Sequence, residues 1–351
     1  MNILDIMQTL VDRNGSDIHL KFGIPPVIRV DGELVPIEGA PALGSQELAM
    51  LIMPLMNEEQ KQRFVENKEF DFAYQFEDKG RFRVNVFLAK GEMASCMRLI
   101  PTRIRTMEEL SLPPIFEKFT TYKQGLVLVT GPTGEGKSTT LAALMDRINT
   151  VRNEHILTIE DPIEFIYEPK KSIISQRELH QDTKDWNVAL RSALREDPNI
   201  VLVGEMRDYE TMASAITVAE TGHLVFATLH TATAAQTVDR IIDVFPAHQQ
   251  SQIRQQLAAT LEAVVSQRLL PRVGGGRVAA FEVMVSNGAI RNLIREGKTY
   301  QIDNSLQTGA DEGNMLIETS LLNLVQNGSI TREDALRTAF RHDQMKRLLG
   351  E

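Results

Sequence analysis

The sequence predicts an α/β protein of two domains, the second of which is built on a doubly wound parallel sheet. The chain has 351 residues, a length that suggests two domains rather than one. In its second part, short apolar runs typical of buried strands alternate with helical patterns, as in a parallel α/β sheet. These runs lie at residues 125–131, 155–159, 200–203 and 224–228. A stretch punctuated by Pro101, Pro113 and Pro114 separates the two parts.

The same patterns place the expected boundaries. The first domain covers residues 1–100, a linker covers 101–123, and the second domain with a C-terminal helical region covers 124–351. In the first domain we expect strands at 17–20, 27–30 and 82–87, turns at 23–26 and Asp31-Gly32, and a helix over 45–65. The three glycines at 274–276 indicate a hairpin turn. Beyond about residue 285 we expect helices alone, at 289–296, 312–327 and 331–349.

Composition narrows the class of protein. The 47 acidic residues outnumber the 38 basic ones, and the formal charge of −9 argues against a dedicated nucleic-acid binder and a polybasic membrane anchor. Cys96 is the only cysteine, which excludes an intramolecular disulfide and a cysteine-rich zinc site and fits a reducing cytosol. Residues 3–11 follow the spacing of a domain helix and not a signal peptide, and no apolar stretch reaches the roughly 18 residues that span a bilayer. We expect a soluble intracellular protein.

The strongest chemical signal is a phosphate-binding loop between a predicted strand and a predicted helix. Its residues are Gly131, Pro132, Thr133, Gly134, Glu135, Gly136, Lys137 and Ser138, followed by Thr139. Glycines let successive backbone N–H groups face the phosphates, and the following helix adds its N-terminal dipole. In this pattern Lys137 reaches the β- and γ-phosphates, and the Ser138 hydroxyl ligates Mg²⁺. The chain is therefore expected to bind a nucleoside triphosphate.

Carboxylates follow two other predicted strands. Glu205 comes after the third apolar run, and because strands of such sheets present their C-terminal ends to the phosphates, it is the candidate that orients and deprotonates the attacking water. Position 204 is glycine where many phosphate-loop enzymes carry a magnesium-orienting Asp, so the metal needs other support. Glu160, Asp161 and Glu164, after the second run, are candidates. The alternatives are a surface carboxylate at 205 and a helix-capping acidic loop at 160–164.

Two histidines flank the fourth apolar run. His223 and His230 are seven residues apart and have opposite parity on a strand, so a joint metal site is not expected. His230 lies past the end of the strand, on the same edge as Glu205, where a sensor of the γ-phosphate would lie. For His223 a packing or capping role is the alternative, and His19 in the first domain is interpreted as structural.

Taken together, these segments resemble the GspE/PilT family of the secretion ATPase superfamily, and within it the type IV pilus retraction ATPases. The matching motifs are SDIHL at 16–20, RFRVNVF at 81–87, GPTGEGKSTT at 131–140, TIEDPIEF at 158–165, LREDPNIVLVGEMRD at 194–208, TGHLVFATLHT at 221–231 and AIRNLIREGK at 289–298. The last is similar to a motif associated with the retraction ATPases and is the most discriminating. Its spacing alone indicates an ordinary amphipathic helix.

The resemblance implies a hexameric ring whose subunits combine a PAS-like N-terminal domain with a RecA-like P-loop ATPase domain and C-terminal helices. It implies hydrolysis of ATP with Mg²⁺ to power pilus retraction and twitching motility. Glu205 is then the catalytic glutamate, and Glu160 and His230 belong to the catalytic set. Arg83 and Arg98 match the arginines that the N-terminal domain supplies to the nucleotide, with Arg81 the lesser candidate. The resemblance further implies that rotation of the N-terminal domain, through the 101–123 linker, would convert hydrolysis into movement.

The resemblance also implies partners and leaves alternatives open. The expected partners are an inner-membrane pilus platform protein (PilC-like) and a PilU-like ATPase at the cytoplasmic face of the inner membrane, with no nucleic acid. The alternatives are a PilU-like accessory retraction ATPase, which would lack the full AIRNLIREGK match, and a pilus-assembly or type II secretion ATPase. Assembly ATPases usually carry a longer N-terminal extension and a four-cysteine segment, and this sequence has neither. A nucleic-acid motor and a nucleotide-gated binding module are the other classes.

One residue departs from the family pattern. Position 135 is Glu, where the family usually has a small residue such as Ser. A carboxylate at a helix N-terminus is favourable toward the dipole but repels phosphate if it points inward. We expect the Glu135 side chain to point outward, with nucleotide affinity or turnover reduced.

Overall fold

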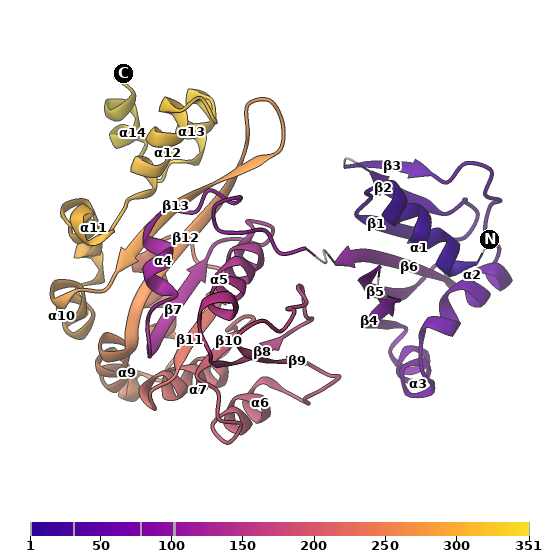
Figure 1. Ribbon diagram of the computed structural model, residues 1–351, viewed down its shortest axis with the longest axis horizontal. Helices are drawn as coiled ribbons and strands as arrows, with labels where there is room; N and C mark the ends of the chain where they lie inside the picture. Colours follow the sequence, from indigo (N-terminus) through magenta and orange to yellow (C-terminus); the bar gives the residue numbers. More distant parts are fainter. Residues whose placement is uncertain (1, 31, 78, 101–102, 351) are drawn as a thin grey trace. The chain divides into compact units, whose positions relative to one another are not determined.

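The structure is a computed structural model that describes residues 2–30, 32–77, 79–100 and 103–350. Its contacts divide the chain into two units, one of residues 1–103 with 164–166 and one of residues 104–163 with 167–351. Each unit contains a sheet and helices (Figure 1), and the expected α/β fold class is confirmed. The sequence-based expectations at Asp31, Pro101 and Thr102 fall outside the described residues. No described helix is long and apolar enough to cross a membrane.

The first unit is a six-stranded antiparallel sheet in the order β3-β2-β1-β6-β5-β4. Its strands are β1 (Asp17–Leu20), β2 (Val27–Val30), β3 (Glu33–Pro36), β4 (Glu69–Phe76), β5 (Gly80–Ala89) and β6 (Glu92–Ile100). Its helices are α1 (Ile3–Asp12), α2 (Ser45–Ile52) and α3 (Glu58–Asn67). The helix expected over 45–65 is thus two helices, because Pro54 lies in a 3₁₀ turn between them and the Asn57 side chain caps α3.

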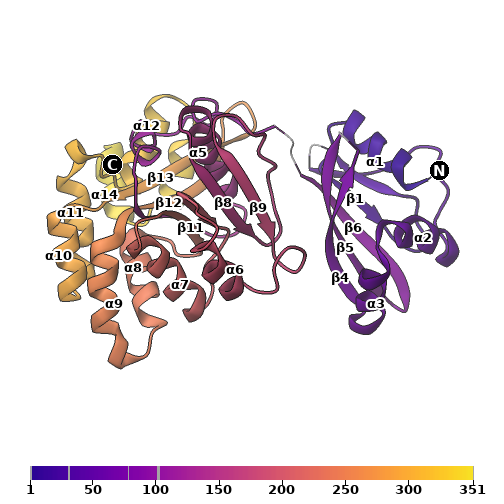
Figure 2. The same cartoon turned by 60° about the horizontal axis from the view of Figure 1, so that its bottom comes forward.

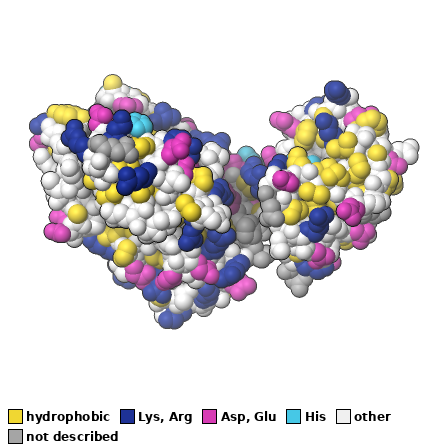
Figure 3. All heavy atoms as spheres, turned by 90° about the horizontal axis from the view of Figure 1, so that it is seen from above, with side chains coloured by type: hydrophobic (Ala, Val, Ile, Leu, Met, Phe, Trp, Pro, Cys, Tyr) yellow, Lys and Arg dark blue, Asp and Glu magenta, His cyan; other side chains and the backbone are white. Residues whose placement is uncertain are grey.

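The two faces of this sheet differ because side chains alternate along each strand. One face is apolar and contributes residues such as Ile18 to the core that the helices cover. The other face carries a row of charges formed by direct cross-strand neighbours. From β2 through β1 and β6 to β5, these are Arg29, Asp17, Arg98 and Arg83. Figure 3 shows a side of this unit on which apolar side chains also gather at the surface.

Asp17 balances the charge row. Its buried carboxylate accepts a hydrogen bond from Arg98 Nε at 2.8 Å and lies 3.6 Å from Arg29 Nε. Burial acts to raise the pKa of Asp17, but hydrogen bonds from Ser16 and Arg98 outweigh it and hold the pKa below its usual range. Asp17 therefore stays ionised and orients Arg98, while 69% of the Arg98 side chain remains exposed.

The second unit contains a seven-stranded sheet in the order β13-β12-β7-β11-β10-β8-β9. Its strands are β7 (Gly125–Thr130), β8 (His155–Glu160), β9 (Ile173–Glu178), β10 (Ile200–Val203), β11 (Leu224–Leu229), β12 (Leu261–Pro271) and β13 (Arg277–Val285). Neighbouring strands pair in parallel except β12 and β13, which form an antiparallel hairpin around the glycines at 274–276. The four predicted apolar runs are β7, β8, β10 and β11, and the predicted hairpin is confirmed.

Helices cover both faces of this sheet (Figure 2). They are α4 (Ile115–Phe119), α5 (Lys137–Val151), α6 (Trp186–Ala193), α7 (Tyr209–Glu220), α8 (Ala234–Asp243), α9 (Ala247–Thr260), α10 (Gly288–Glu296), α11 (Ile302–Thr308), α12 (Ile317–Gln326), α13 (Arg332–Thr338) and α14 (His342–Leu349). Helices α6 to α11 pack on one face against alternate strand residues such as Leu126 and Leu128. Helices α4 and α5 lie on the other face, where Phe116 stacks edge-on against Phe281 of β13.

The C-terminal helices differ in detail from the sequence-based expectation. The segment expected as one helix over 331–349 is two helices, α13 and α14. Between them the N–H groups of Phe340 and Arg341 donate to the Glu318 carboxylate, at 3.0 and 2.8 Å, instead of continuing the helix. The helix expected over 312–327 begins at Ile317. Apolar residues of α12, α13 and α14 pack on the far end of the β12–β13 hairpin.

Arg341 lies among three carboxylates in this region. Its guanidinium donates to Glu318 at 2.8 Å, ion-pairs with Asp303, and lies 3.8 Å from Glu282. The Glu282 carboxylate accepts a hydrogen bond from the N–H of Ala234 at 2.8 Å. Burial raises the pKa of Glu282 to about 7, since the Ala234 N–H and Arg341 offset the cost of desolvation only in part.

We expect this carboxyl to make stability depend on pH. Because the pKa is about 7 in the folded state against 4.5 for the free side chain, the native protein binds the extra proton, and stability is lost as pH rises through 7. The loss should be about 2–3 kcal/mol between pH 5 and pH 8. Glu282→Gln should abolish it and be the more stable variant at pH 8, measured by thermal unfolding across this range. Exposed Glu333→Gln is the control, and parallel curves for parent and Glu282→Gln would contradict the assignment.

Candidate active site

Four strands of the second unit end side by side at one edge of its sheet. In sheet order they are β7, β11, β10 and β8, all parallel. The phosphate loop follows β7, His230 follows β11, Glu205 lies just beyond β10, and Glu160 ends β8. Parallel register thus brings the expected nucleotide-handling residues of the second domain to one edge, which is where ligands bind in sheets of this kind.

The glycines of the phosphate loop are required by its backbone. Gly131, Gly134 and Gly136 have φ angles of +141°, +85° and +81°, in the region that favours glycine. At Gly131 a Cβ atom would lie 2.5 Å from the carbonyl oxygen of Gln267 in β12, so no side chain fits there. A backbone of this shape, free of side chains, fits the close approach of phosphate groups.

Lys137 is buried at the start of α5. Its Nζ donates to the carbonyl oxygens of Gly131 and Pro132, at 2.8 and 2.9 Å, so the ammonium group is held against the loop. Ser138 and Thr139 follow in the first turn of α5, where the helix dipole is positive. The loop, the lysine and the helix N-terminus are therefore arranged as a site for a nucleotide's phosphates.

Glu205 is fixed in position by the strand ends around it. The N–H of Gly204 donates to the carbonyl of Ile159 at 2.8 Å, which ties the residue before Glu205 to β8. The Glu205 carboxylate ion-pairs with Arg207 Nε at 2.5 Å and lies 3.3 Å from His230 Nε2. A carboxylate and an imidazole in contact at the phosphate edge can accept and pass on a proton from water.

Glu160 lies beside this pair but is more deeply buried. Its carboxylate accepts a hydrogen bond from the Thr158 hydroxyl at 2.7 Å. Gly204 matters here, because a Cβ at that position would be 3.2 Å from the Glu160 Cα. Among the residues that the structure describes, no group of three or more His, Cys, Asp or Glu side chains is arranged to hold a metal ion. Glu160, Asp161 and Glu164 therefore do not form such a cluster.

The remaining candidates lie elsewhere. Arg83 and Arg98, with Arg81 nearby on β5, belong to the first unit and its charge row. His223 lies at the opposite end of β11 from His230. Its Nδ1 is 3.0 Å from the Val218 carbonyl oxygen at the end of α7, which fits the capping role.

Two residues at the site were not found from the sequence. Arg207 follows Glu205 by two positions, so its place next to that carboxylate had a local signal. The Nε2 of Gln267 donates to the Glu135 carbonyl at 2.6 Å. No local signal in the sequence indicated this contact, because 132 residues separate the two positions. The Glu135 side chain also differs from expectation, since its carboxylate accepts from the Leu269 N–H of β12 and does not point outward into solvent.

We expect Glu205→Gln to separate nucleotide binding from hydrolysis. The amide cannot take a proton from water, so phosphate release at saturating ATP should fall about 100-fold or more. The phosphate loop is untouched, so the Kd of a fluorescent nucleotide should change by less than about threefold. Glu220→Gln on α7 serves as an isosteric control. Hydrolysis at the parental rate in Glu205→Gln would show that another group is the base.

Comparison with known proteins shows the family to which the chain belongs. The family model described as "Type II/IV secretion system protein" matches residues 2–337. The chain is 49% identical to the type IV pilus retraction ATPase PilT of Pseudomonas aeruginosa, over 97% of this chain and 98% of that protein. It is 38% identical to the type IV pilus ATPase PilU of the same organism, over 97% and 89%. A crystal structure of the pilus retraction motor PilT with bound ADP matches with a TM-score of 0.93 and 45% identity, covering 99% of both chains.

The ADP in the matching structure is a nucleotide, the class of ligand that the phosphate loop of this chain predicts, and the match includes the N-terminal domain as well as the ATPase domain. The family model and the relative each match most of the chain, at residues 2–337 and over 97% of its length. This chain is therefore an ATPase, and it belongs to the family of type II/IV secretion system proteins that includes the PilT pilus retraction ATPases.

Proposed function

We propose that this chain is the subunit of a hexameric, ATP-driven motor that powers type IV pilus retraction and thereby twitching motility. The observation that carries the proposal is the full-length identity of 49% to a pilus retraction ATPase. Identity to the PilU ATPase of the same organism is lower, at 38%, which favours the retraction motor over an accessory role. A pilus-assembly or type II secretion ATPase is the less favoured alternative.

In this proposal the phosphate edge hydrolyses ATP. Residues 131–139 cradle the phosphates, Lys137 neutralises their charge, and the Ser138 hydroxyl would help to hold Mg²⁺. Glu205 activates the attacking water, with His230 beside it at 3.3 Å. Glu160, at the end of β8, is a second carboxylate at the phosphate edge and belongs to the proposed catalytic residues. The metal would neutralise charge on the phosphates, while the residues named here bind and orient the nucleotide.

In this proposal the first unit supplies further positive charge to the nucleotide, through two arginines. We assign a PAS-like domain to residues 1–100, a linker to 101–123 and a RecA-like ATPase domain with C-terminal helices to 124–351. Arg83 and Arg98 lie directly opposite each other on β5 and β6, and their side chains are 47% and 69% exposed. Such a pair is suited to reach a nucleotide at a subunit boundary of the ring, where it adds positive charge during hydrolysis.

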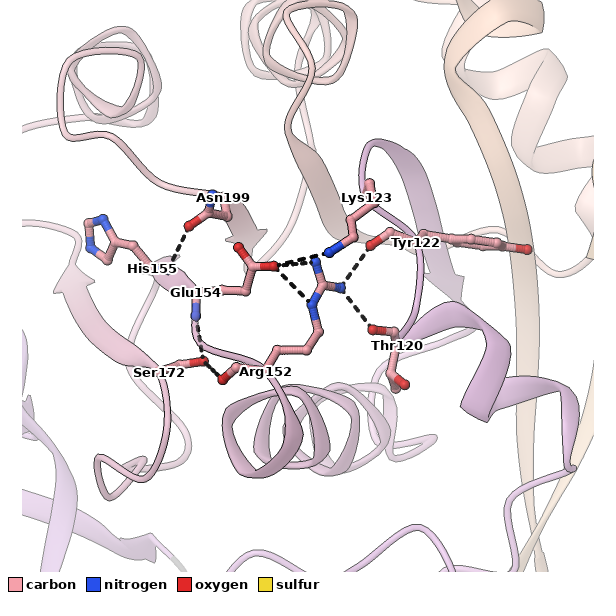
Figure 4. Close-up of polar contacts among 8 residues, drawn as sticks. All are labelled: Thr120, Tyr122, Lys123, Arg152, Glu154, His155, Ser172 and Asn199. Carbon is pink, nitrogen blue, oxygen red and sulfur yellow. Dashed lines mark hydrogen bonds and ion pairs between the residues drawn. The ribbon is translucent and has the colours of Figure 1, made fainter.

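The linker is anchored to the helix that begins at the phosphate loop. Arg147 of α5 makes a forked ion pair with Glu117 of α4, with nitrogen–oxygen distances of 2.6 and 2.9 Å. Arg152, at the end of α5, donates to the carbonyl oxygens of Thr120 and Tyr122 at 2.8 and 2.7 Å (Figure 4). A shift of α5 on nucleotide binding is therefore passed to residues 117–122, which is the route by which hydrolysis would move the linker.

The motor would act at the cytoplasmic face of the inner membrane through its partners. We propose a PilC-like platform protein of the pilus machinery as the docking site and a PilU-like ATPase as a cooperating motor, with no role for nucleic acid. The absence of a membrane-crossing helix from the described residues means that, in this proposal, the platform protein provides the membrane attachment.

Deleting the gene tests the proposal. We expect cells with abundant surface pili and no twitching motility, because assembly continues while retraction stops. Complementation with the parental gene should restore motility, and complementation with Glu205→Gln should not. The measurements are pilus counts by electron microscopy and the diameter of the twitching zone.

Other outcomes would assign the alternatives. Cells without pili would indicate an assembly ATPase and contradict retraction. Full motility in the deletion strain, lost only when a second retraction ATPase gene is also deleted, would indicate an accessory motor.

We expect the Arg147–Glu117 pair to affect pulling more than hydrolysis. Arg147→Glu should leave the ATPase rate within about threefold of the parent but reduce twitching strongly, since like charges repel where α4 meets α5. The swapped variant, Arg147→Glu with Glu117→Arg, should restore twitching because it restores the ion pair. Equal losses of hydrolysis and twitching, or no rescue by the swap, would contradict this role for the anchor.

A further inference from the structure

Glu135 poses an electrostatic problem that the structure resolves. A carboxylate in a phosphate-binding loop repels the ligand if it faces inward and contributes nothing if it lies in solvent. In this chain it does neither, since 21% of its side chain is exposed and the carboxylate is directed at strand β12. The loop residue with the wrong charge for phosphate is thus engaged by the neighbouring strand.

The contact between Glu135 and β12 lies just beyond the point where β12 stops pairing with β7. Strand β12 pairs with β7 only as far as Ser266, opposite Thr130, because the chain of β7 then turns into the phosphate loop. Three residues further on, the backbone N–H of Leu269 donates to the Glu135 carboxylate. This N–H group is partly buried and is stabilised by an acceptor, so Glu135 takes the place of a strand partner at this point.

A second contact holds the backbone of the same residue. The Gln267 side chain is buried, and its Nε2 donates to the carbonyl oxygen of Glu135 at 2.6 Å. Its Oε1 accepts from the Thr140 hydroxyl of α5 at 2.8 Å, so the amide is fixed at both ends. Glu135, in the middle of the phosphate loop, is thus attached to β12 twice. Gln267 binds its backbone carbonyl, and the Leu269 N–H binds its side-chain carboxylate.

The charge of Glu135 also has a partner. Arg268 Nη1 lies 4.0 Å from the Glu135 carboxylate, and only 16% of the Arg268 side chain is exposed. Within the described part of the chain this nitrogen has no hydrogen-bond partner. The guanidinium lies over the ring of Phe340, 5.3 Å from its centroid, which connects β12 to the C-terminal helices. The carboxylate and the guanidinium therefore compensate one another in a partly buried site.

From these contacts we propose that Glu135 is a positioning residue. It holds the phosphate loop in its nucleotide-binding shape by attaching it to Leu269 of β12, and Arg268 neutralises its charge there. Glu135 therefore supports nucleotide binding, opposite to the effect expected from its charge alone. This inference concerns the ATPase site and does not depend on the cellular process that the motor serves.

The two views predict opposite signs for one substitution. If the charge of Glu135 repels phosphate, Glu135→Ser should bind nucleotide more tightly. If Glu135 positions the loop, Glu135→Ser should raise the Kd of ADP and ATPγS about 5–10-fold, because the loop loses an anchor. Glu135→Gln keeps an oxygen acceptor for the Leu269 N–H and should stay within about threefold of the parent. Exposed Glu333→Ser is the control for the change of net charge.

Further readouts distinguish positioning from general damage. At saturating ATP the kcat of Glu135→Ser should match that of the parent while the KM rises, since Lys137 and Glu205 remain in place. The thermal midpoint without nucleotide should match that of the control variant, which shows that the protein folds. Tighter or unchanged binding by Glu135→Ser, or equal losses in the Ser and Gln variants, would overturn the proposal.

Compensation by Arg268 has its own test. In the parental protein, Arg268→Met should raise the nucleotide Kd about 5–10-fold, because it leaves the Glu135 charge unbalanced beside the phosphates. In the Glu135→Gln protein the same substitution should change the Kd less than about twofold, since no charge remains to be balanced. Equal effects in the two backgrounds would show that Arg268 does not act through Glu135.

Discussion

The parallel pairing of β7 with its neighbours is the constraint on which the rest of the site depends. All six residues of β7 are buried, and the strand is held by β11 on one side and β12 on the other. This fixes where β7 ends and hence where the phosphate loop begins. Two glycines then let the backbones meet: Gly131 comes close to Gln267 of β12, and Gly204 comes close to Glu160 of β8. A side chain at position 131 would force β12 away from the phosphate loop, and one at position 204 would crowd the backbone of β8.

Much of this arrangement is encoded locally and could be predicted. The runs that form β7, β8, β10 and β11 are mostly apolar, and the phosphate loop has its strand and helix on either side. Strand β9, with exposed and polar residues such as Ile173 and Gln176, lacks that signal and was missed. The expected single helix over 45–65 overlooked Pro54, which is a local signal for the break between α2 and α3. The break before α14, in contrast, depends on Glu318, a partner 22 residues away from Phe340.

The features of the site that could not be predicted all involve long-range contacts. Gln267 and Leu269 meet the phosphate loop across more than 130 residues of chain, so no local pattern announces them. For the same reason, the effect of Glu135 on nucleotide binding could be predicted from the sequence only through the charge of its carboxylate. Its orientation follows from an N–H group that belongs to another strand.

The distribution of charge reconciles an acidic protein with an anionic ligand. The chain as a whole carries a formal charge of −9, yet the row on the first sheet combines Arg29, Arg98 and Arg83 with the Asp17 carboxylate, and the only other carboxylate that ion-pairs with these three arginines among the described residues is Asp71, 3.7 Å from Arg83. Charges that lie beyond about 10 Å in solution are largely screened, so in the proposed mechanism this local excess of positive charge, and not the net charge, would act on the phosphates.

The buried ion cluster around Arg341 determines how this protein can be shortened or tagged. Arg341 faces Glu318 and Glu282, and Glu282 in turn accepts from Ala234, at the start of the helix that follows His230. A chain that ended after α12 would leave both carboxylates in the core without their cation, next to the phosphate edge. A fragment that keeps this cluster intact must therefore extend at least through Arg341, the residue that precedes α14.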